Sequence, residues 1–353
     1  MTPQRWEEIN NLFNAVVDKD PLEREQMLES LKARDPELCE HVRVLLQQSS
    51  GTWRFTAKTE DLDSGIVAPG ELLHGRYRLA RKIGQGGFGT VYLAHDERLH
   101  QKQVVVKLLT RAPQDEWFQK KFRDEIQALA RIDHPGVVGI LDVGHTSQQT
   151  PFMVMQYIEG VTLRSVIAQG AVESKRAAGI IRQIGQALSA AHAKGVLHRD
   201  LKPENIMLQS PAAGDAVRLI DFGIATIREH ETDAAPTRVA GSVAYMAPEQ
   251  LLGTPAVTSD IFAMGIVACE MLTGRMPVRT VHGVRLESLR AVNPPLPERA
   301  IQIIARAVRM DPQQRIQSAA GFGEELAAAL EHRPEEVVAR QSQSPERPVR
   351  KAA

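Results

Sequence analysis

The chain has 353 residues, a length that suggests about two domains. Its 43 basic and 43 acidic residues balance, so the charge does not indicate a bulk binder of nucleic acid or of an anionic membrane. Two cysteines, Cys39 and Cys269, are too few for a disulfide framework and fit a reducing cytosol. No signal peptide opens the chain, and the apolar run 261–272 is too short to span a bilayer. We therefore expect a cytoplasmic protein with no nucleic-acid partner and no membrane span.

The first part of the chain predicts a small unit of three helices. Apolar residues recur at helical spacing at its start, and the pairs Asp20-Pro21 and Asp35-Pro36 each mark the beginning of a further helix. A three-helix piece of this size is marginally stable alone. We therefore expect residues 1–48 to pack on the rest of the chain or on a partner.

A glycine-rich segment contains the residues Ile83, Gly84, Gln85, Gly86, Gly87, Phe88, Gly89, Thr90 and Val91. Glycines allow backbone amides to approach phosphate oxygens closely, because no side chain intervenes. Similar glycines occur in dinucleotide-binding folds, where a helix follows them. Here β-prone residues lie on both sides, at 77–83 and 90–94. The segment predicts a strand, a phosphate-binding loop and a second strand; a plain glycine-rich turn is the alternative.

Lys107 is the only cation in the apolar run 104–109, which predicts a buried strand. A lysine there is costly unless it meets an opposite charge. In the predicted helix 117–131, Glu125 lies on the same face as an inward stripe of apolar residues. We therefore predict an ion pair between Lys107 and Glu125; the alternative is that each is solvated at the surface.

The most informative stretch is His-Arg-Asp-Leu-Lys-Pro-Glu-Asn at 198–205, followed by Asp-Phe-Gly at 221–223. It supplies an acid, a cation and an amide close together, and a second carboxylate a short hairpin later. These groups are what the transfer of a γ-phosphoryl group needs: a base for the acceptor hydroxyl, a counter-charge for the phosphate and ligands for magnesium. An isolated Asp-Phe-Gly arises by chance, whereas the whole octapeptide at this spacing does not.

With these motifs the chain resembles the protein kinase family, and Lys202-Pro203-Glu204 points to its serine/threonine branch, in the form found in bacteria. The resemblance implies an α+β, two-lobed protein kinase fold preceded by a small helical N-terminal segment. A β-rich lobe would span about 77–155 and a mainly helical lobe about 160–332.

The resemblance also sets the expected boundaries. We expect the protein kinase domain at 75–332, a linker at 49–74 and a polar, proline-bearing tail at 333–353 that is disordered. The segment 1–48 resembles the short helical prefix that precedes some bacterial serine/threonine kinase domains.

The family further implies ATP and Mg2+ in the cleft between the lobes. Asp200 would orient and deprotonate the substrate hydroxyl, and Lys202 would steady the transferring phosphate. Asn205 and Asp221 would bind the magnesium.

Other residues are assigned to the nucleotide by the same resemblance. Lys107 would reach the α- and β-phosphates while Glu125 holds Lys107. Met155 would be the gatekeeper behind the adenine, or plain core, and the backbone from Gln156 to Ile158 would bind the base; Gln156 replaces the usual glutamate. The remaining assigned contacts are Ile83, Gly84, Gln85, Gly86, Gly87, Phe88, Gly89, Val91, Val105, Met207 and Asp221.

The segment 241–249 resembles the substrate-side loop of the family, which ends in Ala-Pro-Glu. Ser242, counted among the catalytic residues, stands where threonine is usual, and its hydroxyl could reach Asp200. Glu249 is expected to form a buried ion pair with Arg315, which is distant in sequence.

Asp260 stands at the start of the apolar helix predicted at 261–272. We expect it to cap this helix, to brace the backbone of the catalytic loop as the family implies, or both. Between Gly274 and Pro297 the chain is shorter than in the family, which usually has another helix there. This departure concerns the substrate-docking surface and not the chemistry.

Regulation is suggested by Arg199, which directly precedes the catalytic aspartate. In the family an arginine there commonly meets a phosphate on the activation loop, here about 224–240. The loop offers Thr226, Thr232 and Thr237, and we expect autophosphorylation at Thr237 with Thr232 as a secondary site. The alternative is a flexible, solvated loop without this control.

The sequence as a whole predicts a serine/threonine protein kinase that transfers the γ-phosphoryl group of ATP to Ser/Thr hydroxyls of protein substrates. The alternative is a pseudokinase-like signalling scaffold that acts through residues 1–48. A pseudokinase usually loses Lys107, Asp200 or Asp221, and all three are present. A small-molecule kinase of the aminoglycoside type would share the lobes, but we would expect neither Lys-Pro-Glu-Asn nor Ala-Pro-Glu in it.

Overall fold

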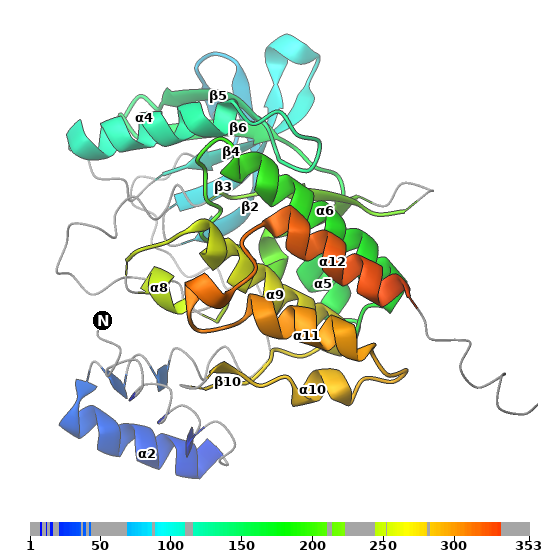
Figure 1. Ribbon diagram of the computed structural model, residues 1–353. Coiled ribbons are helices and arrows are strands. Elements are labelled where there is room, and N and C mark those ends of the chain that lie inside the picture. The colour runs from blue at the N-terminus through cyan, green and yellow to red at the C-terminus, as the bar shows by residue number, and fades with distance from the viewer. Residues whose placement is uncertain are drawn as a thin grey trace, which may run out of the picture.

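The computed structural model has a small, sheet-based lobe above a larger helical lobe (Figure 1). It describes residues 8, 12, 15–16, 21–36, 38–39, 42–43, 69–86, 89–109, 116–209, 214–222, 244–251, 253–280 and 283–332. The order of elements, with strands first and helices after, confirms the predicted α+β, two-lobed fold.

The small lobe is a six-stranded antiparallel sheet with one long helix packed on it. In the spatial order β1-β2-β3-β4-β6-β5, the strands are β1 (Leu72–Leu73), β2 (Tyr77–Gly86), β3 (Gly89–Asp96), β4 (Lys102–Leu108), β6 (Pro151–Gln156) and β5 (Ile140–His145). A 3-10 turn (Glu97–Leu99) follows β3, and the helix is α4 (Glu116–Ala130). Along β4, Val104, Val106 and Leu108 are fully buried, whereas Val105 and Lys107 are partly exposed. This alternation arises because successive side chains of a strand point to opposite faces of the sheet.

The register of the central strands brings several predicted nucleotide contacts onto one face of the sheet. Lys107 on β4 is paired with Val91 on β3 and with Met153 on β6, and Val105 is paired with Met155. Paired residues point to the same face, as do residues two apart along one strand. Val91, Val105, Lys107 and Met155 therefore share the face opposite to the buried core of the sheet.

The two strands predicted on either side of the glycine-rich loop are present as β2 and β3, which pair up to Gly86 opposite Gly89. Gly87 and Phe88, at the predicted loop, lie outside the described residues. Glycine is required at position 89, because a Cβ there would lie 1.8 Å from the carbonyl oxygen of Leu108.

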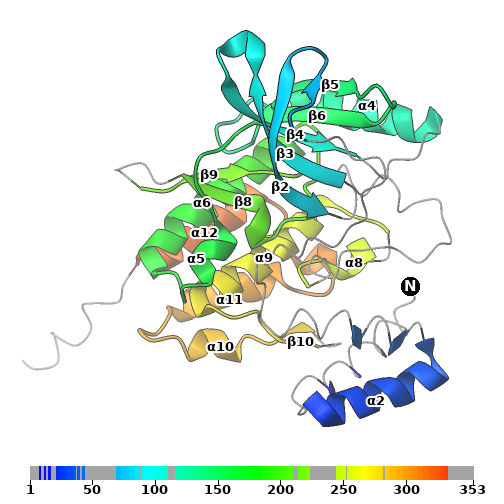
Figure 2. The same ribbon diagram turned by 180° about the vertical axis from the view of Figure 1, so that it is seen from behind.

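The large lobe packs its helices around α9, which is buried along nearly its whole length (Figures 1 and 2). Its helices are α5 (Leu163–Ile167), α6 (Ser174–His192), α8 (Pro248–Leu251), α9 (Val257–Thr273), α10 (Glu287–Arg290), α11 (Glu298–Ala307) and α12 (Ala319–Glu331), with 3-10 turns η2 (Pro203–Asn205) and η4 (Pro312–Gln314). Its strands are β7 (Val161–Thr162), β8 (Ile206–Gln209), β9 (Ala216–Leu219), β10 (Arg279–Thr280) and β11 (Gly283–Val284). A helix that is apolar all round is expected at the centre of such a lobe.

Two predicted helices differ from the observed ones at their ends. The apolar helix expected at 261–272 begins earlier, because Ala256 is the N-cap of α9 and Asp260 lies inside its first turn. The prediction that Asp260 caps the helix is therefore wrong. The helix expected at 117–131 is α4, which is displaced by one residue at each end.

The short region between Gly274 and Pro297 forms a small hairpin and a single helical turn. Strands β10 and β11 pair antiparallel, with Arg279 opposite Val284, and α10 follows them. The region is short, as the sequence indicated, and the helix that the family usually has there is represented by the single turn α10.

The N-terminal segment contains α2 (Pro21–Arg34), which begins at the first Asp-Pro pair as predicted. At the second pair, Oδ1 of Asp35 accepts a hydrogen bond from the backbone N–H of Leu38 at 3.0 Å, the contact expected of an N-cap. A small core of its own is buried here, formed by Val16, Leu28, Leu38, Cys39 and Val42. Figures 1 and 2 show α2 beyond the end of the helical lobe that carries β10.

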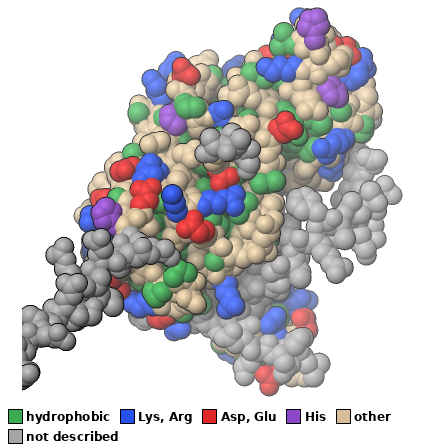
Figure 3. Space-filling model, turned by 90° about the vertical axis from the view of Figure 1, so that its right-hand side faces the viewer, with side chains coloured by type: hydrophobic (Ala, Val, Ile, Leu, Met, Phe, Trp, Pro, Cys, Tyr) green, Lys and Arg blue, Asp and Glu red, His purple; other side chains and the backbone are tan. Residues whose placement is uncertain are grey.

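The charged side chains are dispersed rather than gathered. On the face in Figure 3, basic and acidic side chains are interspersed among polar and apolar ones. Within the described ranges, no helix has the length and apolarity that a membrane crossing requires.

Helices α6 and α12 approach one another through glycines. A Cβ on Gly185 would lie 2.5 Å from the carbonyl oxygen of Ala319, and the Cα of Gly323 would be 3.3 Å away. The two backbones can pack this closely only because neither helix has a side chain at the crossing.

We predict that Gly185→Ala lowers the free energy of unfolding by about 1–3 kcal/mol, because the added methyl overpacks this crossing. Gly179→Ala is the matched control on the same helix, since a Cβ at Gly179 meets no atom within 4 Å; it should stabilise the protein by about 0.4–1 kcal/mol. Urea unfolding of the two variants and the wild type measures both effects. Equal stability of the two variants would contradict the close approach.

Candidate active site

Lys107 and Asp221 form an ion pair between the two lobes. Lys107 Nζ donates a hydrogen bond to Oδ1 of Asp221 at 2.7 Å, and 14% of the lysine side chain is exposed. Burial by itself would raise the pKa of Asp221, but the charge and the hydrogen bond of Lys107 hold this pKa below its ordinary value. Asp221 is therefore a carboxylate at neutral pH, the form that binds a metal ion.

Glu125 is held by a different cation from the one predicted. Nη1 of Arg199 donates to Oε1 of Glu125 at 3.2 Å, whereas Lys107 donates to Asp221. The predicted Lys107–Glu125 ion pair is therefore wrong for this structure. The apolar face of α4 correctly indicated that Glu125 needs a cation, but two cations lie near the cleft and the tertiary structure decides between them.

Two of these four residues have left-handed backbones. The φ angles of Arg199 and Asp221 are 62° and 57°. This region costs non-glycine residues of the order of 1–3 kcal/mol and persists only where the surroundings impose it. Here the surroundings are hydrogen bonds: the backbone N–H of Arg199 donates to Asp260 at 2.9 Å, and the side chain of Asp221 accepts from Lys107.

The catalytic-loop residues predicted from the octapeptide come together around Asp200. Its Oδ2 accepts hydrogen bonds from Nζ of Lys202 at 2.8 Å and from Nδ2 of Asn205 at 3.1 Å. Asn205 Nδ2 also donates to the backbone carbonyl of Asp200 at 2.8 Å. The other carboxylate oxygen, Oδ1, is shielded from solvent and has no hydrogen-bond partner among the described residues. Asp200 thus presents one tethered oxygen and one oxygen that can accept a proton or a hydrogen bond.

Asp260 braces the loop, as predicted. It is 1% exposed on α9, and its carboxylate accepts from the backbone N–H of His198 at 2.8 Å and of Arg199 at 2.9 Å. Nε2 of His192 lies 2.7 Å from the same carboxylate. A buried carboxylate needs such partners, so the apolar helix and the loop fix each other.

Glu249 and Arg315 form the buried ion pair predicted from sequence. The guanidinium of Arg315 donates to both carboxylate oxygens, at 2.7 and 2.9 Å, and its side chain is completely buried. Oγ of Ser259 donates to Glu249 at 2.6 Å. Burial by itself would raise the pKa of Glu249, but these hydrogen bonds hold it below its ordinary value of 4.5.

A cluster around Tyr245 was missed by sequence reasoning. The hydroxyl of Tyr245 donates to Oε2 of Glu270 at 2.5 Å. Arg164, at the start of α5, donates to Glu270 at 2.6 Å and to Glu204 of the catalytic loop at 2.7 Å, and also contacts the tyrosine hydroxyl. No local motif marks these residues, because they come from four separate segments.

A small cavity borders the cleft side of the ion pair. Its lining residues are Lys107, Leu129, Val138, Ile140, Met153, Met155, Leu219, Asp221 and Phe222. Met155 therefore packs against the core and also lines the cavity, while its role as gatekeeper behind the adenine stays a prediction. The ring of Phe222 also packs on His198, with ring centroids 4.5 Å apart, so the two catalytic motifs touch.

The remaining residues assigned to the nucleotide are distributed over both lobes. They lie at the end of β2 (Ile83, Gly84, Gln85, Gly86), at the start of β3 (Gly89), at and after the end of β6 (Gln156, Ile158) and on β8 (Met207). Ser242, like Gly87 and Phe88, lies outside the described residues.

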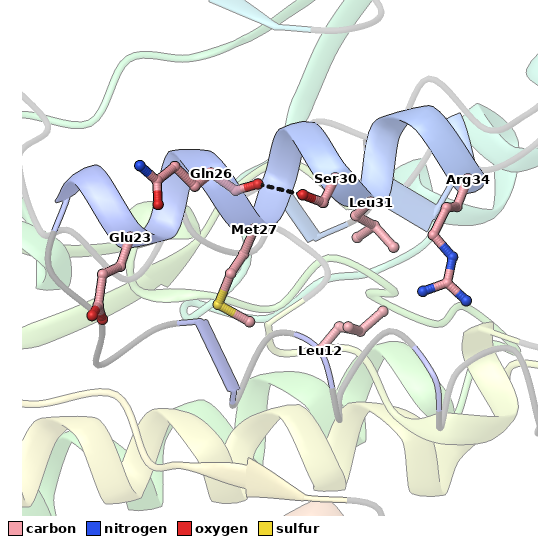
Figure 4. A pocket seen from close by; sticks show the side chains of 7 residues that line it. All are labelled: Leu12, Glu23, Gln26, Met27, Ser30, Leu31 and Arg34. Carbon is pink, nitrogen blue, oxygen red and sulfur yellow. Dashed lines mark hydrogen bonds between the residues drawn. The ribbon is translucent and has the colours of Figure 1, made fainter.

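A second hollow, of about 470 Å³, lies in the N-terminal segment (Figure 4). Leu12, Met27 and Leu31 give it an apolar floor, and Glu23 and Arg34 flank it. It contains none of the residues of the catalytic motifs.

The side chains of Asn205 and Asp221 fit a magnesium ion that would be bound mainly through phosphate. Among the described residues, no group of three or more His, Cys, Asp or Glu side chains could hold a metal ion. Magnesium usually takes only one or two carboxylates and completes its shell with water and substrate phosphates. Asp221 offers an ionised carboxylate, and Asn205 keeps its amide oxygen available because the amide nitrogen binds Asp200.

Comparison with known proteins shows which proteins this chain is similar to. The family model described as "Protein kinase domain" matches residues 77–329. Serine/threonine-protein kinase PrkC of Bacillus subtilis is 36% identical over 274 residues, covering 74% of this chain and 42% of PrkC. Serine/threonine-protein kinase PknB of Mycobacterium tuberculosis is 34% identical over 280 residues, covering 75% of this chain and 44% of PknB. The chain thus spans less than half the length of these curated relatives.

Solved structures agree with the sequence relatives. The kinase domain of Mycobacterium tuberculosis PknI has a TM-score of 0.60 at 25% identity, covering 75% of this chain and all of that domain. Rad53 1-466, crystallised in complex with AMP-PNP, has a TM-score of 0.59 at 25% identity, covering 71% of this chain and 65% of that one.

We predict that Glu249→Gln lowers the free energy of unfolding at pH 7 by about 3 kcal/mol, because it leaves the buried guanidinium of Arg315 without a counter-charge. The lowered pKa of Glu249 means that its carboxylate stabilises the fold above the unfolded-state pKa and that this stabilisation is lost as the pH falls. The difference between variant and wild type should therefore shrink below about pH 4.5.

Glu298→Gln is the control, since Glu298 and Arg290 form an exposed pair worth at most about 1 kcal/mol. Urea unfolding at pH 7 and in acid measures both variants. If Glu249→Gln lowers the free energy of unfolding no more than Glu298→Gln does, the prediction that the buried pair stabilises the fold more than the exposed pair is contradicted.

Proposed function

The chain belongs to the protein kinase family, and we propose that it is an ATP-dependent serine/threonine protein kinase. In this proposal it transfers the γ-phosphoryl group of ATP to Ser and Thr hydroxyls of protein substrates. The observation that carries the proposal is the hydrogen-bonded set of Asp200, Lys202 and Asn205, next to the Lys107–Asp221 ion pair. The rings of His198 and Phe222, which belong to the same two motifs, lie 4.5 Å apart between centroids, so the two groups of residues belong to one site.

Asp200 is the proposed base. Its carboxylate accepts the proton of the acceptor hydroxyl as the new bond between oxygen and γ-phosphorus forms and the bond to the leaving ADP breaks. Lys202, fixed 2.8 Å from Oδ2, keeps a positive charge where the transferring phosphoryl group carries negative charge. The tether through Lys202 and Asn205 orients the carboxylate before the substrate arrives.

ATP and Mg2+ are the proposed co-substrate and cofactor. A related fold, Rad53, has been crystallised with AMP-PNP, which supports a nucleotide in the cleft. A magnesium ion would neutralise phosphate charge, and Asn205 and Asp221 are the residues that would hold it. The proposed contacts of Lys107 with phosphate require it to share or leave its present bond with Asp221.

Retention of the catalytic set argues against the scaffold alternative. Lys107, Asp200 and Asp221 are all present and in contact with other members of the set, so a pseudokinase is not supported. Two finer points remain part of the proposal: a protein partner for residues 1–48, and a cytoplasmic location, which the two buried free cysteines favour.

Regulation through the activation loop is proposed from the position of Arg199. This arginine now holds Glu125, 3.2 Å away, and so keeps it from Lys107. A phosphate on Thr237 would add about −1.5 to −2 charges and compete with Glu125 for the guanidinium. Glu125 released in this way could pair with Lys107, which would free Asp221 for magnesium. Thr226, Thr232 and Thr237 lie outside the described residues.

We predict that Lys107→Met, Asp200→Asn and Asp221→Asn each nearly abolish phosphorylation of a generic protein substrate while the protein stays folded. For Asp200→Asn the loss should be about 10²–10⁴-fold, the usual contribution of a positioned base. Radiolabelled ATP, with circular dichroism as the folding control, measures the loss, and phosphoamino-acid analysis of the wild-type product should show phosphoserine and phosphothreonine. Wild-type activity in folded Asp200→Asn, or a product that is mainly phosphotyrosine, would contradict the assignment.

We further predict autophosphorylation at Thr237, with Thr232 as a secondary site. Mass spectrometry of dephosphorylated recombinant protein, before and after incubation with ATP and magnesium, should locate the phosphate between residues 224 and 240. The double variant Thr232→Ala/Thr237→Ala should lose most of its activity toward an added substrate, whereas Thr226→Ala should retain it. Absence of phosphate in this range, or full activity of the double variant, would exclude this control.

A further inference from the structure

The short region between Gly274 and Pro297 contributes a cation to the segment that faces the substrate. We infer that Arg279, on β10, is a positioning residue for the protein substrate; this rests on the kinase function proposed above. Its hydrogen-bond acceptor within the described part of the chain is the backbone carbonyl of Ala244.

The geometry places the guanidinium of Arg279 between an aromatic ring and a carbonyl group. Its Nη1 donates a hydrogen bond to the carbonyl oxygen of Ala244 at 2.9 Å. Its Cζ lies 5.1 Å from the centroid of the Phe262 ring, within the range of a cation–π contact. Phe262 is completely buried on α9, so the ring is a rigid support for the guanidinium.

Arg315 contacts the same ring but cannot replace Arg279. Its Cζ lies 4.9 Å from the Phe262 centroid. All five of its N–H donors are used, two on Glu249 and three on backbone carbonyls, and a guanidinium has no sixth. Those carbonyls belong to Thr258, Arg309 and Met310.

Arg279 remains a cation in this setting. Burial lowers the pKa of Arg279 to about 10, with the charge of Arg315 acting in the same direction and Glu249 opposing both. At neutral pH the guanidinium is therefore protonated, and its hydrogen bond to the carbonyl is charge-assisted.

The segment that Arg279 holds lies against the catalytic loop. Nε2 of Gln250 donates to the backbone carbonyl of Arg199, one residue before Asp200. The segment 244–251 thus reaches the loop that carries Asp200, and in this inference it forms one side of the site for the acceptor peptide.

Besides Gln250, the described residues Ala244, Tyr245 and Glu249 of this segment are held by side chains of the large lobe, and the contact at Ala244 differs from the other two. Tyr245 is held by Glu270, and Glu249 by Arg315. Ala244 is the first described residue after position 222, and its carbonyl is held by the hairpin of the shortened region. The hairpin thus supports this segment from the region that is shorter here than is usual in the family.

Loss of this support should affect the acceptor peptide and spare the nucleotide. Without the hydrogen bond the chain at Ala244 gains freedom, and peptide binding must restrict it again. The ion pair of Lys107 and Asp221 lies on other elements and keeps its partners. Arg279→Met should therefore raise KM for an acceptor peptide about tenfold, the typical consequence of losing a charge-assisted hydrogen bond, with KM for ATP changed less than twofold.

The experiment compares the full-length wild type with Arg279→Met, Arg279→Lys and Arg285→Met, using a serine-containing peptide that the wild type phosphorylates. Arg285 is the control, because it lies in the same hairpin and its side chain is exposed. KM for peptide, KM for ATP and kcat are measured for each protein, together with hydrogen–deuterium exchange of the amides in 244–251. Arg279→Lys should fall between wild type and Arg279→Met in peptide KM, Arg285→Met should match the wild type, and exchange in 244–251 should be faster in Arg279→Met alone.

The outcomes separate this inference from the proposed function. A wild type that phosphorylates no Ser or Thr peptide would overturn the kinase proposal, and the exchange measurement would still test whether Arg279 holds the segment. An active wild type with unchanged peptide KM in folded Arg279→Met, or with an equal rise in both KM values, would overturn the role of Arg279. If Arg279→Met does not fold, Arg279→Lys decides the question, since a wild-type peptide KM and wild-type exchange in that variant contradict the need for the guanidinium.

Discussion

The catalytic loop depends on one buried carboxylate, that of Asp260. It sits on the most deeply buried helix of the large lobe and accepts the backbone N–H groups of His198 and Arg199. Burying a carboxylate is costly unless it is hydrogen-bonded, so the bonds between Asp260 and these amides are strongly favoured. This contact holds the backbone of Arg199 in a left-handed conformation and thereby sets the position of the next residue, Asp200. The apolar packing of α9 thus determines the position of a polar catalytic group.

Four charged groups at the cleft can be paired in more than one way. In the structure Lys107 pairs with Asp221 and Arg199 pairs with Glu125, so both carboxylates are neutralised. Neither has the partner that the proposed nucleotide-bound site would need, in which Glu125 would hold Lys107 and Asp221 would hold magnesium. Exchange of partners costs little when each charge finds another of opposite sign, because no charge is left buried alone. Such a set can respond to a new anion, and in the proposed function the nucleotide and a phosphorylated activation loop would both be new anions. Helix α4 and the catalytic loop are therefore coupled through charge as well as through packing.

The substrate-side segment is held mainly by arginines from distant parts of the chain. Arg164, Arg279 and Arg315 come from α5, β10 and the turn after η4, and they bind a tyrosine hydroxyl, a carbonyl oxygen and a carboxylate respectively. Arginine suits this task because its planar fork makes several hydrogen bonds at once and stacks on an aromatic ring such as Phe262. The segment is thereby attached to the rigid core of the large lobe, while the residues from 223 to 243 lie outside the described structure.

The sequence by itself determined the catalytic loop, because the octapeptide at 198–205 carries its own spacing. Through its resemblance to the protein kinase family it also predicted the fold class and the Glu249–Arg315 pair. The sequence did not determine which cation binds Glu125, since Lys107 and Arg199 both satisfy the chemistry and only their positions in space distinguish them. It also gave no sign of the Tyr245 cluster or of Arg279. Their partners are far apart in the chain, and the packing of α5, α9 and the short hairpin alone brings them together.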